Sequence, residues 1–136
     1  ATRDDRLNAL QEILLQLHAS DAISREYRVV DANLSLQRFA DTYLLESAQP
    51  VVYFAASEGR YRGMVMVDEL NYVERSLWET QNLFRLIHPL SEIPTVEEST
   101  RLVNVIQQME TEQLRQITVL SPAGAVAGVI DRGDIV

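Results

Sequence analysis

Leucines recur along the first part of the chain at the spacing of one helix face. They stand at Leu7, Leu10, Leu14 and Leu17, and Ile13 widens the apolar stripe. This spacing predicts an amphipathic helix over about residues 4–19. The helix either packs on the rest of the chain or leads in from a preceding part of a longer protein, and the two roles are compatible.

The following segment alternates β-like runs with one helical pattern. The patterns predict a strand at 27–30, a helix capped by Asn33 that carries residues 36–44, and a hairpin of strands 50–56 and 61–67 about a turn at 57–60. A further helical stretch is expected over residues 68–85, with a break near residues 77–78. Trp78, at that break, is expected to anchor the segment on the core, although an exposed tryptophan would suit a partner surface.

The last third of the chain repeats this order of elements. We expect a strand at 92–96, a helix capped by Ser99 with an apolar stripe over 102–109, a hairpin of strands 116–120 and 125–130 about a turn at 121–124, and a helix that opens at Asp131. Two segments with one order of elements indicate an internal duplication.

Matching residues of the two halves stand at a nearly constant separation. It is 66 positions for Val30 with Val96, Asn33 with Ser99, Leu36 with Leu102, Tyr43 with Met109, and Val51-Val52-Tyr53 with Ile117-Thr118-Val119. It falls to 65 for Gly59 with Gly124, Gly63 with Gly128, and Leu70 with Ile135. The first glycine of each half falls in a turn that favours positive φ, and the second in a strand where glycine indicates a bulge or a close backbone approach.

The duplication predicts an α+β fold made of two pseudo-symmetric βαββα repeats packed together, plus the N-terminal helix, because each small sheet with helices on one face leaves the other face to be buried. The expected boundaries are 1–21 for the lead-in helix, 22–77 for the first repeat, and 78–136 for a linker helix and the second repeat.

Composition narrows the function. The formal net charge is −8 and the pI is about 4.7, which argues against nucleic acid and against an anionic membrane surface as partners. There is no cysteine, which excludes disulfides and thiolate chemistry, and no apolar run long enough to span a bilayer, so no direct membrane insertion is expected. The chain begins with Ala1 and is interpreted as a fragment of a longer protein.

The repeated segments resemble a known family. Residues 30–36 with 50–52, and residues 96–102 with 116–119, each followed by a hairpin and a Gly-x-x-x-x-x-acid-aliphatic tail, look like a tandem pair of cystathionine-β-synthase (CBS) domains, a Bateman module. The resemblance covers about residues 22–136, and the second half is also similar to the CBS region of cyanobacterial-type site-2 membrane metalloproteases.

The resemblance implies a regulatory module that performs no catalysis. It implies a ligand such as AMP, ADP, ATP or S-adenosylmethionine, a homodimer, a cytoplasmic location and a parent enzyme, transporter or membrane protease. The implied ligand cleft takes in Asp134, Asp131, Glu69 and Thr95, with Asp134 and Glu69 as acceptors for ribose hydroxyls.

The chain departs from the family's Gly-x-x-Thr/Ser-x-x-Asp pattern at the hydroxyl position. Asp131 stands there in the second repeat and Met66 in the first, so the first repeat is expected to bind no ligand, and a phosphate beside Asp131 would need Arg132 or Arg101 to offset the carboxylate. The alternative function is a purely structural homodimerisation domain with degenerate ligand sites.

Other chemistry finds little support in the sequence. His88 and Glu92 have the spacing of two metal ligands on one helix face, but Pro89 between them disturbs a helix, so no metal site is expected and His88 is interpreted as a hydrogen-bonded linker residue. No convergent acid, base and nucleophile set is recognisable, which argues against a small stand-alone enzyme.

Overall fold

The computed structural model describes residues 9, 11–13, 15–45 and 51–135, without the side chains of residues 134 and 135. The chain divides into two compact units, Glu26–Ile93 and Ala1–Arg25 together with Pro94–Val136. Each holds one β-sheet and short helices, so the predicted α+β fold of two similar units is confirmed. The boundaries 1–21, 22–77 and 78–136 stay a prediction.

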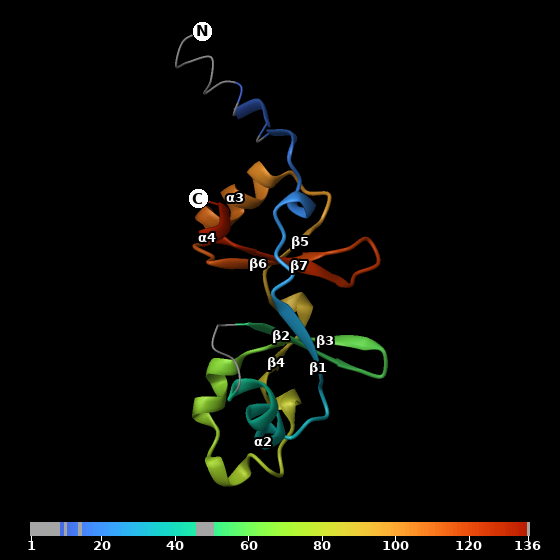
Figure 1. The fold of residues 1–136 in the computed structure, drawn as a ribbon, viewed down its shortest axis with the longest axis vertical. Coiled ribbons are helices and arrows are strands. Elements are labelled where there is room, and N and C mark those ends of the chain that lie inside the picture. The colour runs from blue at the N-terminus through green and yellow to red at the C-terminus, as the bar shows by residue number, and fades with distance from the viewer. Residues whose placement is uncertain (1–8, 10, 14, 46–50, 136) are drawn as a thin grey trace. The chain divides into compact units, whose positions relative to one another are not determined.

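The unit Glu26–Ile93 is built on a four-stranded sheet of order β1-β2-β3-β4. Its strands are β1 (Tyr27–Asp31), β2 (Val52–Ser57), β3 (Arg60–Val65) and β4 (Ile87–His88). The pair β1–β2 is parallel, whereas β2–β3 and β3–β4 are antiparallel. Its helical elements are α2 (Leu36–Phe39), the π-helix η2 (Ala40–Leu44), and the 3-10 turns η3 (Val67–Tyr72), η4 (Arg75–Leu77), η5 (Leu83–Leu86) and η6 (Leu90–Glu92). Figure 1 shows α2 and most of these turns on one face of the sheet.

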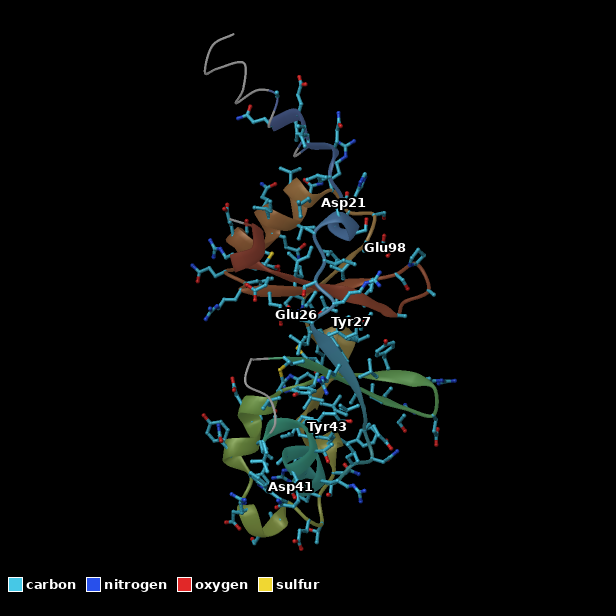
Figure 2. The ribbon with its side chains drawn as sticks, viewed as in Figure 1. Asp21, Glu26, Tyr27, Asp41, Tyr43 and Glu98 are labelled. Atoms are coloured by element: carbon cyan, nitrogen blue, oxygen red, sulfur yellow. The ribbon has the colours of Figure 1, made fainter. Side chains whose placement is uncertain are left out.

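An aromatic cluster fills the core of this unit. The ring centroids of Phe39 and Tyr53 lie 5.2 Å apart, and Tyr43, labelled in Figure 2, lies 5.6 Å from the first ring and 5.8 Å from the second. Trp78 packs against the same core, and its indole N–H donates to the carbonyl oxygen of Val73 at 3.0 Å. The prediction that Trp78 anchors its segment on the core is therefore confirmed.

The other unit holds the second repeat, on a three-stranded sheet of order β5-β6-β7. Its elements are η1 (Ala19–Asp21), β5 (Thr95–Glu97), α3 (Leu102–Thr111), β6 (Gln116–Leu120), β7 (Val126–Asp131) and α4 (Arg132–Ile135). β5 runs parallel to β6, and β7 runs antiparallel to it. Leu102, Val105 and Met109 of α3 are buried against Ile117 and Val119 of β6.

An additional segment pairs with the edge of each sheet. In sequence, this segment directly precedes the first strand of the other repeat. Residues around Ser24 pair with β7, where Ser24 and Val129 exchange backbone hydrogen bonds of 2.7 and 3.0 Å. Residues 86–88 close the four-stranded sheet in the same manner, through β4. The short strand β4 was not anticipated from the sequence, because two residues carry no periodicity.

Both glycine predictions are confirmed by the backbone. Gly59 and Gly124 have φ of 73° and 81° in their hairpin turns. A Cβ on Gly63 would fall on the carbonyl oxygen of His88, and one on Gly128 would lie 2.8 Å from the carbonyl oxygen of Ser24. In each repeat, glycine is therefore needed where the additional segment, around His88 or Ser24, packs closely against the strand.

Two predictions about helices were wrong or only partly testable. Residues 9, 11–13, 15 and 16 are helical and the helix ends before Leu17, whereas the rest of the predicted stretch 4–19, with Leu7, Leu10 and Leu14, lies outside the described residues. Residues 68–85 form 3-10 turns and no α-helix, because their buried apolar residues recur at a spacing of three, as in Leu70 with Val73 and Leu83 with Leu86.

The predicted helix caps were also wrong. Ser35, and not Asn33, caps α2 and accepts a hydrogen bond from the Arg38 amide at 3.0 Å. The backbone amide of Asn33 instead donates to Oδ1 of Asp31 in the turn after β1, at 2.9 Å. The helix α3 begins after Arg101 and not after Ser99, because the Leu102 amide donates to the carbonyl oxygen of Leu17.

The strand register corrects the alignment of the repeats at the central strands. Ala55 pairs with Val30 and Gly63, and Val119 pairs with Val96 and Gly128, so these two residues are equivalent at a separation of 64 and not 66. The paired residues Val30 and Ala55 are 25 positions apart in the first repeat, whereas Val96 and Val119 are 23 apart in the second. The longer connection of the first repeat contains η2. Phe54 therefore corresponds to Thr118.

Candidate functional site

The candidate ligand residues of the second repeat lie at one end of its sheet. Thr95 begins β5 and pairs with Thr118 of the central strand β6, and Gln116 of β6 pairs with Asp131 at the end of β7. Because directly paired residues share a face of the sheet, Thr95, Gln116, Thr118 and Asp131 lie on one face. Ile117 and Val119 face α3, so this polar row lies on the face opposite that helix.

Thr118 gives the polar row an unusual feature. Its side chain is 1% exposed, and its hydroxyl has no hydrogen-bond partner among the described residues. A buried hydroxyl without a partner is unfavourable, since it loses its hydrogen bonds to water on folding. Neither Thr118 nor Gln116 was singled out from the sequence, and only the register of β6 identifies them.

The corresponding face of the first repeat is apolar. By strand pairing and repeat spacing, Thr95, Gln116, Thr118 and Asp131 correspond to Val29, Val52, Phe54 and Met66. Phe54 is fully buried, and its ring makes an edge contact with Tyr27 at a centroid distance of 5.6 Å. The two repeats thus share a backbone plan but differ in the chemistry of this face.

Asp131 already serves the start of α4. Its exposed carboxylate accepts a hydrogen bond from the Gly133 amide at 2.8 Å, so it caps the short helix that carries Asp134. The Arg132 amide donates to the carbonyl oxygen of Arg115 at 2.8 Å, which brings two exposed arginines to this end of the sheet. The side chain of Asp134 lies outside the described residues.

Arg101 does not join this set. It precedes α3, beyond the opposite end of β5, and lines a pocket of about 420 Å³ with Glu12, Leu15, Gln16 and His18. The arginine whose backbone pairs with that of Arg132 is Arg115, which was not singled out from the sequence.

Glu69 belongs to the other unit and has a partner of its own. Its Oε1 lies 2.8 Å from Nε2 of His88, and both side chains are about two-fifths exposed, at 43% and 40%. The prediction that His88 makes a satisfied hydrogen bond is confirmed. In the same sheet, burial and the neighbouring Tyr27 raise the pKa of Tyr61 above its usual value of 10.0.

The part of the chain that the structure describes contains no group of three His, Cys, Asp or Glu side chains able to hold a metal ion. Its helices include none with the length and apolar character to cross a bilayer.

Comparison with known proteins agrees with this geometry. Residues 86–136 match the CBS domain family. The chain is 21% identical over 119 residues to a candidate zinc metalloprotease of Synechocystis sp.. This match covers 87% of the chain but only 31% of that protein. The chain therefore spans less than a third of this relative's length.

Solved structures share the fold at low sequence identity. A CBS domain-containing protein of unknown function from Bacillus anthracis is 13% identical with a TM-score of 0.70, over 92% of this chain and 94% of that one. The CBS domain of a bacterial CNNM/CorC family Mg²⁺ transporter, solved in complex with ATP, is 14% identical with a TM-score of 0.66, over 98% and 94%. At these identities the likeness establishes the fold alone.

Proposed function

Because residues 86–136 belong to the CBS domain family, whose members are regulatory, we propose that the whole chain is a tandem CBS pair serving as a non-catalytic regulatory module of a larger protein. Its ligand is an adenine nucleotide or a related molecule, such as AMP, ADP, ATP or S-adenosylmethionine. The ligand binds at the second repeat and shifts the parent protein between two states.

The polar row on the second sheet is the observation that carries this proposal. Thr95, Gln116 and Asp131 offer donors and acceptors at one end of the sheet, and Thr118 adds a buried hydroxyl that lacks a partner among the described residues. A ligand with several polar groups, such as a ribose or a purine edge, matches such a surface, since a binding site places a few polar groups in a largely apolar frame.

The charges at this end of the sheet suit a phosphorylated ligand. Arg115 and Arg132 are exposed at the same end of the sheet as Asp131, whose Oδ1 accepts a hydrogen bond from the Gly133 amide, and their guanidinium groups would suit a phosphate. The ATP-bound structure of the transporter CBS domain is consistent with this ligand class. Asp134 is the proposed acceptor for the ribose hydroxyls.

The parent protein and the assembly belong to the same proposal. Relatives are a candidate zinc metalloprotease and the CBS domain of a magnesium transporter, so a membrane protein with this module on its cytoplasmic side is the parent we expect. Two modules pair into a homodimer, which gives the parent a symmetric regulatory element.

A structural homodimerisation domain without a ligand is the second candidate. It is favoured by Asp131, because a carboxylate that caps α4 stands where the family carries a hydroxyl for the ligand. The two candidates differ in one observable: a sensor gains stability when a ligand is added, and a structural domain only associates as its concentration rises.

The test is a thermal-shift titration of the chain with AMP, ADP, ATP and S-adenosylmethionine. A ligand at 100 times its Kd adds about 2.7 kcal/mol, which for a domain of this length raises Tm by about 10 °C. Asp134→Ala should abolish the shift, and Glu69→Gln, the matched change in the first repeat, should preserve it. Absence of a shift with all four ligands, together with concentration-dependent association, would establish the structural candidate instead.

A further inference from the structure

The unit that holds the second repeat has a pocket beyond the end of β5, away from its polar row. The pocket has a volume of about 420 Å³. Three of its lining residues belong to the helical segment before η1 and two to the junction of that segment with α3: Glu12, Leu15, Gln16, His18 and Arg101. Pockets that bind small molecules have volumes of about 300–1,000 Å³, so this one can take a small metabolite.

Backbone hydrogen bonds hold the two walls of the pocket together. His18 and Arg101 pair as an isolated antiparallel bridge. Beside this bridge, the Leu102 amide donates to the carbonyl oxygen of Leu17 at 2.8 Å. Leu17 packs against the apolar core of the unit, and Leu102 is part of that core. The side chains of His18 and Arg101 therefore extend from a fixed backbone.

The first repeat has the same junction with different side chains. Ser35 pairs with Asn82 there, in the corresponding antiparallel bridge. Both side chains serve helix starts: Ser35 accepts from the Arg38 amide at 3.0 Å, and Asn82 accepts from the Phe84 amide at 3.1 Å. Arg101 stands at the position of Ser35, but its side chain makes no capping hydrogen bond to α3. The second repeat thus presents a guanidinium group where the first has a helix cap.

Two opposite charges line the pocket without neutralising each other. Among the described residues, neither the guanidinium group of Arg101 nor the carboxylate of Glu12 has an ion-pair or hydrogen-bond partner. Arg101 stands at the start of α3, where the helix dipole adds positive potential. The imidazole of His18 adds a donor on the same side, with its Nδ1 3.9 Å from Oδ2 of Asp21. The pocket therefore offers groups for a carboxylate at one side and a carboxylate of its own for a cation.

From these observations we propose that the pocket binds a free α-amino acid with an apolar side chain. The ligand's carboxylate binds Arg101 and His18, and its ammonium group binds Glu12. Its side chain packs against Leu15, which is 48% exposed and forms the apolar wall. A polyanion such as ATP is repelled by Glu12, so this site is separate from the proposed nucleotide site and does not depend on it.

The experiment is an amide-resolved NMR titration of the 136-residue chain with L-leucine, leucinamide and isocaproate. Leucinamide lacks the carboxylate of leucine, and isocaproate lacks its ammonium group. L-Leucine should cause saturable shifts at the amides of Gln16, His18 and Arg101. Each analogue should bind about 10- to 100-fold more weakly, because it loses one charge-assisted interaction.

Two variants assign the charged groups of the pocket. Arg101→Gln should weaken leucine binding and remove the preference for leucine over leucinamide, whereas Glu12→Gln should remove the preference for leucine over isocaproate. Arg25→Gln and Glu110→Gln are the matched controls, because both residues are exposed in the same unit and do not line the pocket; they should bind leucine as the wild type does. The amide spectrum of each variant shows whether it is folded.

Three results would overturn this inference: an unchanged spectrum at millimolar leucine, equal binding of the three ligands, or leucine binding that survives both Arg101→Gln and Glu12→Gln. Leucine-induced shifts at Thr95 and Asp131 in place of the pocket residues would also overturn it. None of these results bears on the proposed function, which is tested separately by the response of the chain to nucleotides.

Discussion

Replacement of Gly63 by alanine tests how the four-stranded sheet is closed. Gly63 lies in β3 with φ of 147°, a conformation that residues with a Cβ rarely adopt. The added Cβ would fall on the carbonyl oxygen of His88 and would lie 2.7 Å from its carbonyl carbon and 2.9 Å from Cγ2 of Ile87. Two of these three atoms are backbone, so the overlap is relieved only if β4 moves away.

The magnitude follows from two contributions. Backbone strain at a glycine-only conformation costs about 2 kcal/mol, and overlap with a packed neighbour costs about 2 kcal/mol more. Gly63→Ala should therefore lower the free energy of unfolding by about 4 kcal/mol. Gly59→Ala is the matched control, because Gly59 has φ of 73° with no atom within 4 Å of the added Cβ; we expect a loss of about 1 kcal/mol from strain alone.

Urea unfolding followed by tryptophan fluorescence reports on this unit directly. Trp78 is the chain's one tryptophan and lies in the unit Glu26–Ile93. The predicted difference between the two variants is about 3 kcal/mol, obtained from their midpoints at a common slope. If Gly63→Ala were as stable as Gly59→Ala within about 1 kcal/mol, the account of β4 as a closely packed closing strand would be refuted.

Three further predictions follow from single contacts. Ser35→Ala should cost about 1 kcal/mol, because its side chain caps α2, whereas Asn33→Ala should cost a few tenths, and equal losses in urea unfolding would show that the cap is misassigned. Thr118→Val should leave the chain as stable or raise its stability by about 1 kcal/mol, since a buried hydroxyl without a described partner is removed, and a loss above about 2 kcal/mol would reveal a partner. The pKa of Tyr61 in the folded chain is raised above 10.0, so the free energy of unfolding should decline as the pH rises from 10 through the raised value. Tyr61→Phe should reduce that decline, which urea midpoints measured across the alkaline range would show.

The sequence was informative wherever periodicity and duplication carried the signal. The hairpins, the stripe of α3 and the paired glycines were predicted because alternation, helical spacing and positive φ each leave a local pattern. The helix predicted over 68–85 was wrong because a spacing of three fits 3-10 turns, and the caps were displaced because backbone carbonyls of distant segments fix both helix starts.

The site was less accessible to sequence reasoning because it depends on strand register. An offset of 66 aligned Val52 with Thr118, whereas the pairing of β2 and β6 aligns Phe54 with Thr118. Only the corrected register reveals that one face is polar in the second repeat and apolar in the first. The contact between Glu69 and His88 joins residues 19 positions apart, and no spacing rule predicts it.

The two repeats differ in the chemistry of equivalent positions. The second has polar groups at the end of its sheet and an acidic residue in α4. The first has Val29, Phe54 and Met66 at the matching positions, and its acidic residue Glu69 is paired with a histidine.

Binding of the nucleotide at the second repeat can be tested by an amide-resolved NMR titration of the chain with ATP. We expect saturable shifts at the amides of Thr95, Gln116, Asp131 and Gly133, with the matched positions Val29, Val52 and Met66 unchanged. Shifts concentrated on the first repeat, or an unchanged spectrum at millimolar ATP, would contradict it.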